Sequence, residues 1–133
     1  MRALIVEDEM TSRVILQKIL SGFGEVQVCI DGNEAIEAFC TAHDNQTPYD
    51  LICMDFMMPE IDGYDALKRI RTIEADKGIT PEGRAKVIMT TGLNNIETEY
   101  EDIAAMADAI LLKPIRKDSF IETLGKLGFS QHG

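Results

Sequence analysis

Five short apolar runs alternate along this chain with longer stretches in which apolar residues recur every three or four positions. The first pattern is typical of buried β-strands and the second of amphipathic helices. The strands are expected at residues 3–6, 26–30, 51–54, 87–89 and 109–112. Five strand–helix repeats in a chain of 133 residues predict an α/β fold, in which a five-stranded parallel sheet carries helices on both faces.

Each helical stretch carries one apolar stripe that would face the core. An aspartate followed three residues later by a carboxylate marks two helix starts, at Asp31 and Asp62. Residues 51–54 are apolar throughout, as expected at the centre of the sheet, whereas Gln27 in the second run indicates an edge strand. The five stripes are Leu16, Ile19, Leu20 and Phe23; Ala35, Ile36, Phe39 and Cys40; Leu67, Ile70 and Ile73; Ile96, Tyr100, Ile103 and Ala107; and Phe120, Leu124 and Leu127.

Length and composition indicate one domain over residues 1–133, with a frayed tail in the last few residues. No apolar run approaches the roughly 18 residues that a membrane span requires. The chain begins with a short strand that ends in acid, which is unlike a signal peptide. We therefore expect a cytoplasmic protein without membrane insertion. The formal net charge of −10 disfavours nucleic acid and suits cations or basic partner surfaces.

The cysteines and histidines form no recognisable metal or redox motif. Cys29, Cys40 and Cys53 include no Cys-x-x-Cys pair and lie among apolar residues, which predicts reduced, buried thiols. His43 and His132 are isolated and are expected at the surface.

Polar side chains follow four of the five expected strands. Glu7 and Asp8 follow the first strand, Asp55 the third, Thr91 the fourth and Lys113 the fifth. Ligands of open α/β sheets bind beyond the carboxyl ends of the strands, so these side chains should meet there. Three crowded carboxylates repel one another unless a cation shares their site. An oxygen-rich site of this kind suits Mg²⁺.

The same constellation can carry phosphoryl chemistry. A carboxylate such as Asp55 can act as a nucleophile and form an aspartyl-phosphate. Lys113 and the cation would then neutralise the phosphoryl oxygens, and Thr91 would donate a hydrogen bond to one of them. Thr90, the preceding threonine, is expected to be structural, and Glu9 and Asp50 are expected to be solvated turn residues.

The ordered motifs give these residues a family context. The segments Leu4-Ile5-Val6-Glu7-Asp8-Glu9, Met54-Asp55-Phe56-Met57-Met58-Pro59, Asp62-Gly63, Thr91-Gly92 and Lys113-Pro114 together resemble bacterial response-regulator receiver domains, of the stand-alone CheY-like chemotaxis type. The resemblance implies a flavodoxin-like receiver fold with strand order 2-1-3-4-5, often with a cis bond before the proline.

The resemblance also assigns roles to individual residues. Asp55 would be the phosphoacceptor, and Thr91 and Lys113 would contact the phosphoryl group. Asp8 and Asp55 would bind Mg²⁺ (or Mn²⁺) directly, together with the backbone carbonyl of Met57. Glu7 would act through metal-bound water.

The function implied is that of a monomeric signalling switch rather than an enzyme, although it assists its own phosphorylation and dephosphorylation. A histidine kinase or histidine phosphotransfer protein would supply the phosphoryl group. Output would be by protein contact over the fourth helix, the fifth strand and the fifth helix. Chemotaxis and phosphorelay both remain open, as does the downstream protein target.

The chain departs from the family pattern at several positions. Glu7 stands where aspartate is commonest, Ile110 replaces a frequent aromatic residue three positions before the lysine, and Gly92 replaces a frequent alanine. Met57 and Leu93 occupy the two positions that flank the path of hydrolytic water in the family. We expect their apolar side chains to shield the phosphoryl group and prolong its lifetime.

The sequence bears on three alternative functions. The chain could be a receiver cut from a longer response regulator or hybrid kinase. An aspartyl-phosphate hydrolase would need an Asp-x-Asp motif, and the residue two after Asp55 is Met57, which cannot donate a proton. A flavin-binding electron carrier would need a phosphate loop after the first strand, where the segment Glu7-Asp8-Glu9-Met10 is acidic.

Overall fold

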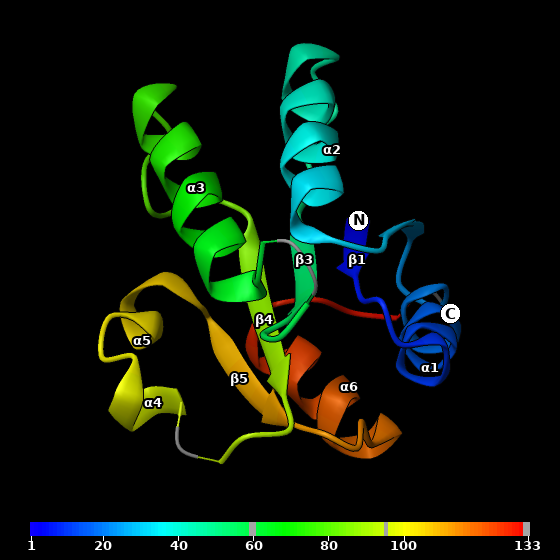
Figure 1. Cartoon of the computed structure of the whole chain (residues 1–133). Coiled ribbons are helices and arrows are strands. Elements are labelled where there is room, and N and C mark those ends of the chain that lie inside the picture. The colour runs from blue at the N-terminus through cyan, green and yellow to red at the C-terminus, as the bar shows by residue number, and fades with distance from the viewer. Residues whose placement is uncertain (59–60, 95, 132–133) are drawn as a thin grey trace.

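The computed structural model describes residues 1–58, 61–94 and 96–131, without the side chains of residues 97 and 98. Helices and strands alternate along the chain, except that two helices, α4 and α5, follow each other, as Figure 1 shows. The strands are β1 (Arg2–Val6), β2 (Glu25–Cys29), β3 (Leu51–Asp55), β4 (Lys86–Thr91) and β5 (Ala109–Leu112). The helices are α1 (Met10–Leu20), α2 (Gly32–Asp44), α3 (Gly63–Asp76), α4 (Ile96–Glu99), α5 (Ile103–Met106) and α6 (Lys117–Lys126).

The five strands form one parallel sheet in the order β2-β1-β3-β4-β5. This confirms the predicted parallel sheet and its strand order. Every residue of β3 is buried, whereas Gln27 in β2 is exposed, so β3 is central and β2 lies at an edge as predicted. Uniformly apolar strands suit the middle of such a sheet because helices cover both of its faces.

The core consists of two apolar layers, one on each face of the sheet. On one face, Leu4, Ile52 and Met54 pack with Phe39 of α2 and Leu67 of α3. On the other face, the alternate strand residues pack against α1 and α6; among them are Ala3, Ile5, Leu51, Cys53, Ile88, Leu16, Leu20, Phe120 and Leu124. In Figure 1, α2 and α3 lie beside each other, apart from α1 and α6. Helices therefore cover both faces, which confirms the prediction.

The predicted helix starts are confirmed. The side chain of Asp31 accepts a hydrogen bond of 2.8 Å from the Glu34 amide, and Asp62 accepts one of 2.9 Å from the Asp65 amide. The prediction for Glu9 was incomplete, because its carboxylate caps α1 by accepting hydrogen bonds from the Thr11 and Ser12 amides. Such a side chain satisfies amides that the first turn of a helix leaves without partners.

The fourth apolar stripe does not form the single helix that its spacing predicts. It forms two four-residue helices, α4 and α5, separated by residues 100–102. The amide of Ile103 donates to the carbonyl of Tyr100, three residues back, so the regular helical ladder stops there. Ile96 and Ile103 are nevertheless buried, so the stripe correctly marks the core-facing side.

The cysteines are free, and Cys29 and Cys53 are buried as predicted. Burial raises the pKa of the Cys29 thiol to about 11 and raises that of Cys53 further. Cys40 is only half-buried, so the prediction of three buried thiols was wrong there. His43 is also half-buried, with its ring 4.7 Å from that of Phe39, and His132 lies outside the described residues. Among the described residues, no helix has both the length and the hydropathy that crossing a membrane requires.

Candidate metal and phosphoryl-transfer site

Three carboxylates meet at the carboxyl end of the sheet. Glu7, Asp8 and Asp55 each offer an oxygen atom, and these oxygens all lie within 4.8 Å of one another. The pairing of Val6 with Met54 brings the ends of β1 and β3 together, which is the convergence that the strand ends predict. Glu7 is 1% exposed and Asp55 is 6% exposed, whereas Asp8 is exposed. The cluster is therefore buried on one side and open to solvent at Asp8.

Lys113 reaches the cluster from the end of β5. Its Nζ lies 2.8 Å from Glu7 Oε1 and 3.3 Å from Asp55 Oδ2. The contact with Glu7 is an ion pair rather than an aligned hydrogen bond. The Lys113 amide donates to the Thr91 carbonyl at 2.7 Å, and the peptide bond to Pro114 is cis, as the resemblance implies. Lys113 is therefore a part of the site and not an ordinary surface lysine.

Burial and neighbouring charges shift the pKa values of Glu7 and Lys113. Desolvation raises the pKa of Glu7 to about 7, Lys113 opposes this change, and the neighbouring Asp55 adds to it. Desolvation also lowers the pKa of Lys113, but Glu7 and Asp55 outweigh it, and the net pKa is raised. One ammonium thus neutralises only part of the charge of three carboxylates, so the cluster favours an added cation.

The loop between β1 and α1 is held in place from α1. Nη1 of Arg13 donates to the carbonyl of Glu7 at 3.2 Å and is 3.5 Å from the carbonyl of Asp8. The Glu9 amide donates to Glu7 Oε2 at 3.2 Å, while the Glu9 carboxylate is engaged at the start of α1. Arg13 was not among the predicted site residues. The sequence signal for this role was a basic residue in the first turn of the helix that follows Glu7 and Asp8.

The loop after β3 is fixed by one amide and one glycine. The Met57 amide donates to Asp55 Oδ1 at 3.3 Å, which orients that carboxylate. A Cβ at Gly63 would lie 2.0 Å from the Asp55 carbonyl oxygen, so only glycine allows α3 to begin this close to the strand. The Asp62-Gly63 motif therefore combines a helix cap with a close approach to the site.

The two threonines of β4 differ in their partners. Both are 1% exposed. The Thr91 hydroxyl accepts a hydrogen bond of 2.9 Å from the Leu93 amide, whereas the Thr90 hydroxyl has no hydrogen-bond partner in the part of the chain that the structure describes. Met57 and Leu93 are 61% and 40% exposed, so both side chains extend toward solvent near the site.

The residues present fit a hard divalent cation. The cluster offers carboxylate oxygens on an open, partly solvated edge, as Mg²⁺ and similar cations prefer. None of the clustered groups is a thiol or an imidazole, the softer donors that select zinc or copper.

Comparison with known proteins supports the same reading. A family model described as the response regulator receiver domain matches residues 3–125. This chain belongs to the response regulator receiver domain family. Receiver domains are parts of two-component signalling systems, so the family resemblance seen in the sequence is confirmed.

Individual relatives cover the receiver domain in different contexts. The chemotaxis protein CheY of Bacillus subtilis is 32% identical, over 94% of this chain and 95% of that protein. The probable histidine kinase 2 of Oryza sativa is also 32% identical, over 93% of this chain, but this chain spans only 12% of that kinase. The response regulator TrrA of Thermotoga maritima, solved in complex with magnesium and beryllofluoride, matches with a TM-score of 0.75 at 29% identity, over 95% of this chain and 97% of that one.

Proposed function

We propose that this receiver domain accepts a phosphoryl group on Asp55 and works as a phosphorylation-dependent signalling switch. The observation that carries the proposal is the buried carboxylate of Asp55 in a cluster with Glu7 and Asp8, with Lys113 Nζ 3.3 Å from its Oδ2. Mg²⁺ or Mn²⁺ would be held by Asp8, Asp55 and the carbonyl of Met57, with Glu7 acting through a bound water. The complex of TrrA with magnesium and beryllofluoride supports this reading by analogy.

Asp55, Lys113 and Thr91 each have a different role in the transfer. An oxygen of Asp55 attacks the phosphorus, the bond between phosphorus and the donor's leaving group breaks, and the leaving group departs with the electron pair. Lys113 moves its positive charge toward the phosphoryl oxygens, and the Thr91 hydroxyl donates to one of them. A divalent cation held by the cluster would supply further positive charge to the same oxygens. Positioning and charge neutralisation supply most of the catalysis in such a transfer.

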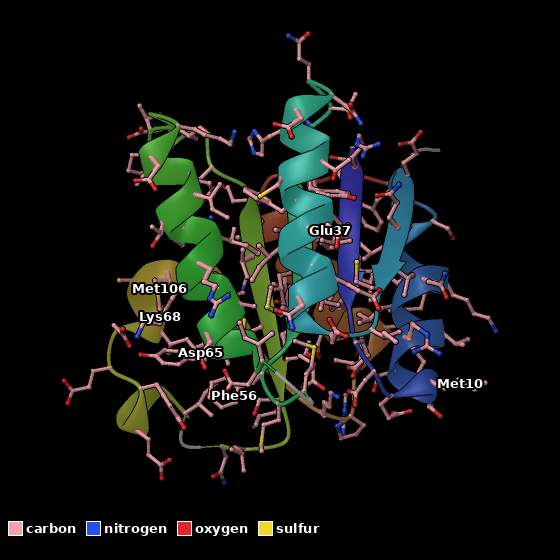
Figure 2. All side chains as sticks on the ribbon, turned by 45° about the horizontal axis from the view of Figure 1, so that its top comes forward. Met10, Glu37, Phe56, Asp65, Lys68 and Met106 are labelled. Carbon is pink, nitrogen blue, oxygen red and sulfur yellow. The ribbon has the colours of Figure 1, made fainter. Side chains whose placement is uncertain are left out.

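The donor is proposed to be a histidine kinase or a histidine phosphotransfer protein. Exposed apolar side chains lie on the elements that begin or end beside the cluster, and they offer such a donor an apolar surface. They are Met10 and Val14 on α1, Met57 after β3 and Leu93 after β4. In Figure 2, Met10 extends outward from the start of α1. Both a chemotaxis output and a relay are compatible with this surface.

The output surface is proposed to lie over α4, α5, β5 and α6. In β5, Leu112 is 54% exposed and Ile110 is half-buried, so the edge strand offers apolar side chains to a partner. The Thr91 hydroxyl binds the Leu93 amide, which leads directly into α4. A change in the bonding of Thr91 would therefore be transmitted to the segment before α4.

Labelling with a small phosphodonor tests the proposed phosphoacceptor. Incubation with acetyl phosphate and Mg²⁺ should add one phosphoryl group, measured by intact-mass spectrometry, and Asp55→Asn should abolish the addition. Asp50→Asn is the matched control, because Asp50 directly precedes the same strand at its opposite end and binds the Arg2 amide. Labelling of Asp55→Asn to the level of the wild type would refute the assignment.

A further inference from the structure

Glu7, Asp55 and Thr90 occupy one row across the sheet. Asp55 pairs with Thr90 in the register of β3 and β4, and Glu7 follows the pairing of Val6 with Met54. Side chains at one level of neighbouring parallel strands lie on the same face. The same face carries an apolar row two residues earlier in each strand, and that row packs toward α1 and α6. Its members are Ile5, Cys53, Ile88 and Ala109. Thr90 therefore belongs to the polar row that caps this layer.

The hydroxyl of Thr90 has no bonding role that the fold explains. Thr90 is 1% exposed, and Oγ1 is without a partner among the described residues. Burying an unpaired hydroxyl costs free energy, and a valine would fill the same space in a strand without that cost. The neighbouring Thr91, by contrast, has its hydroxyl bonded to the Leu93 amide. A structural role for Thr90 accounts for its methyl group and its branching but not for its hydroxyl.

Lys113 reaches its partners from the end of β5, which lies on the far side of β4 from β3. Thr90 pairs with Leu111 of β5, and Lys113 lies two residues further, on the same face. β4 lies between β5 and β3, so the Lys113 side chain must pass over the carboxyl end of β4 to place Nζ 3.3 Å from Asp55 Oδ2. Among the residues of β4, Thr90 is the one that pairs with Asp55, and strand alternation places it on the same face as Lys113.

We propose that Thr90 is a positioning residue for phosphoryl transfer at Asp55. Its hydroxyl forms a hydrogen bond to the Asp55–Lys113 pair when the charge on that pair changes. The proposal rests on Asp55 being the phosphoacceptor. Before transfer, Lys113 neutralises the ionised carboxylate of Asp55. After transfer, that carboxylate is an acyl phosphate, and the negative charge lies on the phosphoryl oxygens.

A hydroxyl suits this change because it can donate and accept. It can accept from the Lys113 ammonium or donate to the Asp55 oxygen that remains a carbonyl, while it leaves the phosphorus untouched. With acetyl phosphate, the bond from Asp55 to phosphorus forms as the bond from phosphorus to acetate breaks. Acetate leaves with the electron pair, so no further reactant is needed.

The test compares Thr90→Val with Thr90→Ser in the full chain. The initial rate of acetyl phosphate labelling at saturating Mg²⁺ should fall by roughly tenfold in Thr90→Val, the effect of about 1.4 kcal/mol on a barrier. Thr90→Ser should stay within about twofold of wild type, because it keeps the hydroxyl. The melting temperature of Thr90→Val should equal or exceed that of wild type, and its Mg²⁺ affinity should be unchanged. A purely structural role would instead move the melting temperature with the rate.

Three results would overturn the inference about Thr90. A wild-type rate in Thr90→Val overturns the inference while Asp55 remains the labelled residue. So does an equal loss in Thr90→Ser and Thr90→Val, or a defect confined to Mg²⁺ affinity. Asp55→Asn, run in parallel, separates these results from failure of the proposed function: if Asp55→Asn is labelled as well as wild type, the phosphoacceptor assignment falls, and the inference falls with it.

Discussion

The hydroxyl of Tyr64 on α3 donates a hydrogen bond of 2.5 Å to Asp102 Oδ1, in the turn between α4 and α5. The Tyr100 ring lies in the same turn, 4.8 Å from Tyr64 and 5.0 Å from Phe56 between ring centroids. Phe56 directly follows Asp55, and Figure 2 shows it below the start of α3, on the side of the α4–α5 segment. A continuous set of contacts therefore connects the residue after the proposed phosphoacceptor with α4 and α5.

This aromatic cluster of Phe56, Tyr64 and Tyr100 should transmit the state of Asp55. Tyr100→Leu should leave acetyl phosphate labelling intact but reduce the NMR shift changes in α4 and α5 on addition of beryllofluoride and Mg²⁺. It should also lower the free energy of unfolding by about 1–3 kcal/mol, since two aromatic pairs are lost. Tyr64→Phe keeps the rings and removes only the bond to Asp102, so it separates the two contributions. Unchanged shift responses in Tyr100→Leu would contradict this route.

Metal affinity should depend on Asp8 more than on Glu7. The resemblance makes Asp8 a direct ligand and Glu7 one that acts through water, so Asp8→Asn should weaken Mg²⁺ binding by at least about tenfold, or ~1.4 kcal/mol. Glu7→Gln should weaken it less. Isothermal titration of the two variants against wild type measures both effects. A greater loss from Glu7→Gln would reverse the ranking.

Replacing Asp8 should also change the stability of the fold, in a direction that depends on Mg²⁺. Without divalent cation, Asp8→Asn should be at least as stable as wild type, because it removes one of three mutually repelling carboxylates. Urea unfolding with and without Mg²⁺ checks this, and the order should invert when Mg²⁺ is present, since binding to the folded state stabilises it. A loss of stability in the metal-free variant would show that Asp8 has a structural role instead.

Arg71 should be the most sensitive charged residue for stability. Its side chain is 10% exposed, lies 2.8 Å from Glu74 and 3.2 Å from Asp108, and donates to the carbonyls of Ala85 and Met106. Arg71→Met should cost about 3–5 kcal/mol of unfolding free energy, because it removes the ion pair of the buried Glu74 carboxylate and one of the two ion pairs of Asp108. Arg69→Met, an exposed change on the same helix, is the control and should stay near wild type. The double change Arg71→Met with Glu74→Met should recover part of the loss.

The features that could be predicted from the sequence are those that depend on local residue patterns and on which residues end the strands. The sheet, the edge position of Gln27, the caps at Asp31 and Asp62 and the meeting of Asp55 with Lys113 all follow from periodicity, capping chemistry and parallel topology. The break between α4 and α5 did not follow, because the contacts of Tyr100 and Asp102 with α3 that accompany it are distant in sequence. The Arg71 cluster was not predicted for the same reason, since every partner except Glu74 is distant in sequence, at Ala85, Met106 and Asp108.

The lifetime of the phosphoryl group should depend on Met57 and Leu93. The amide of Met57 binds Asp55, and the amide of Leu93 binds Thr91, so both backbones are tied to site residues at 3.3 Å and 2.9 Å. Their exposed side chains therefore stand at the open edge of the site, and neither can hydrogen-bond an attacking water.

Polar replacements at these two positions should speed hydrolysis. The double change Met57→Asn with Leu93→Glu should orient an in-line water and raise the decay rate of the phosphorylated domain by about tenfold, or ~1.4 kcal/mol of barrier. Decay is followed by mass spectrometry after removal of acetyl phosphate. Met10→Asn, another exposed methionine near the site but outside both loops, is the control and should leave the decay rate unchanged. If the double variant decays at the wild-type rate, shielding by Met57 and Leu93 does not set the lifetime, and access of water must be controlled by other residues.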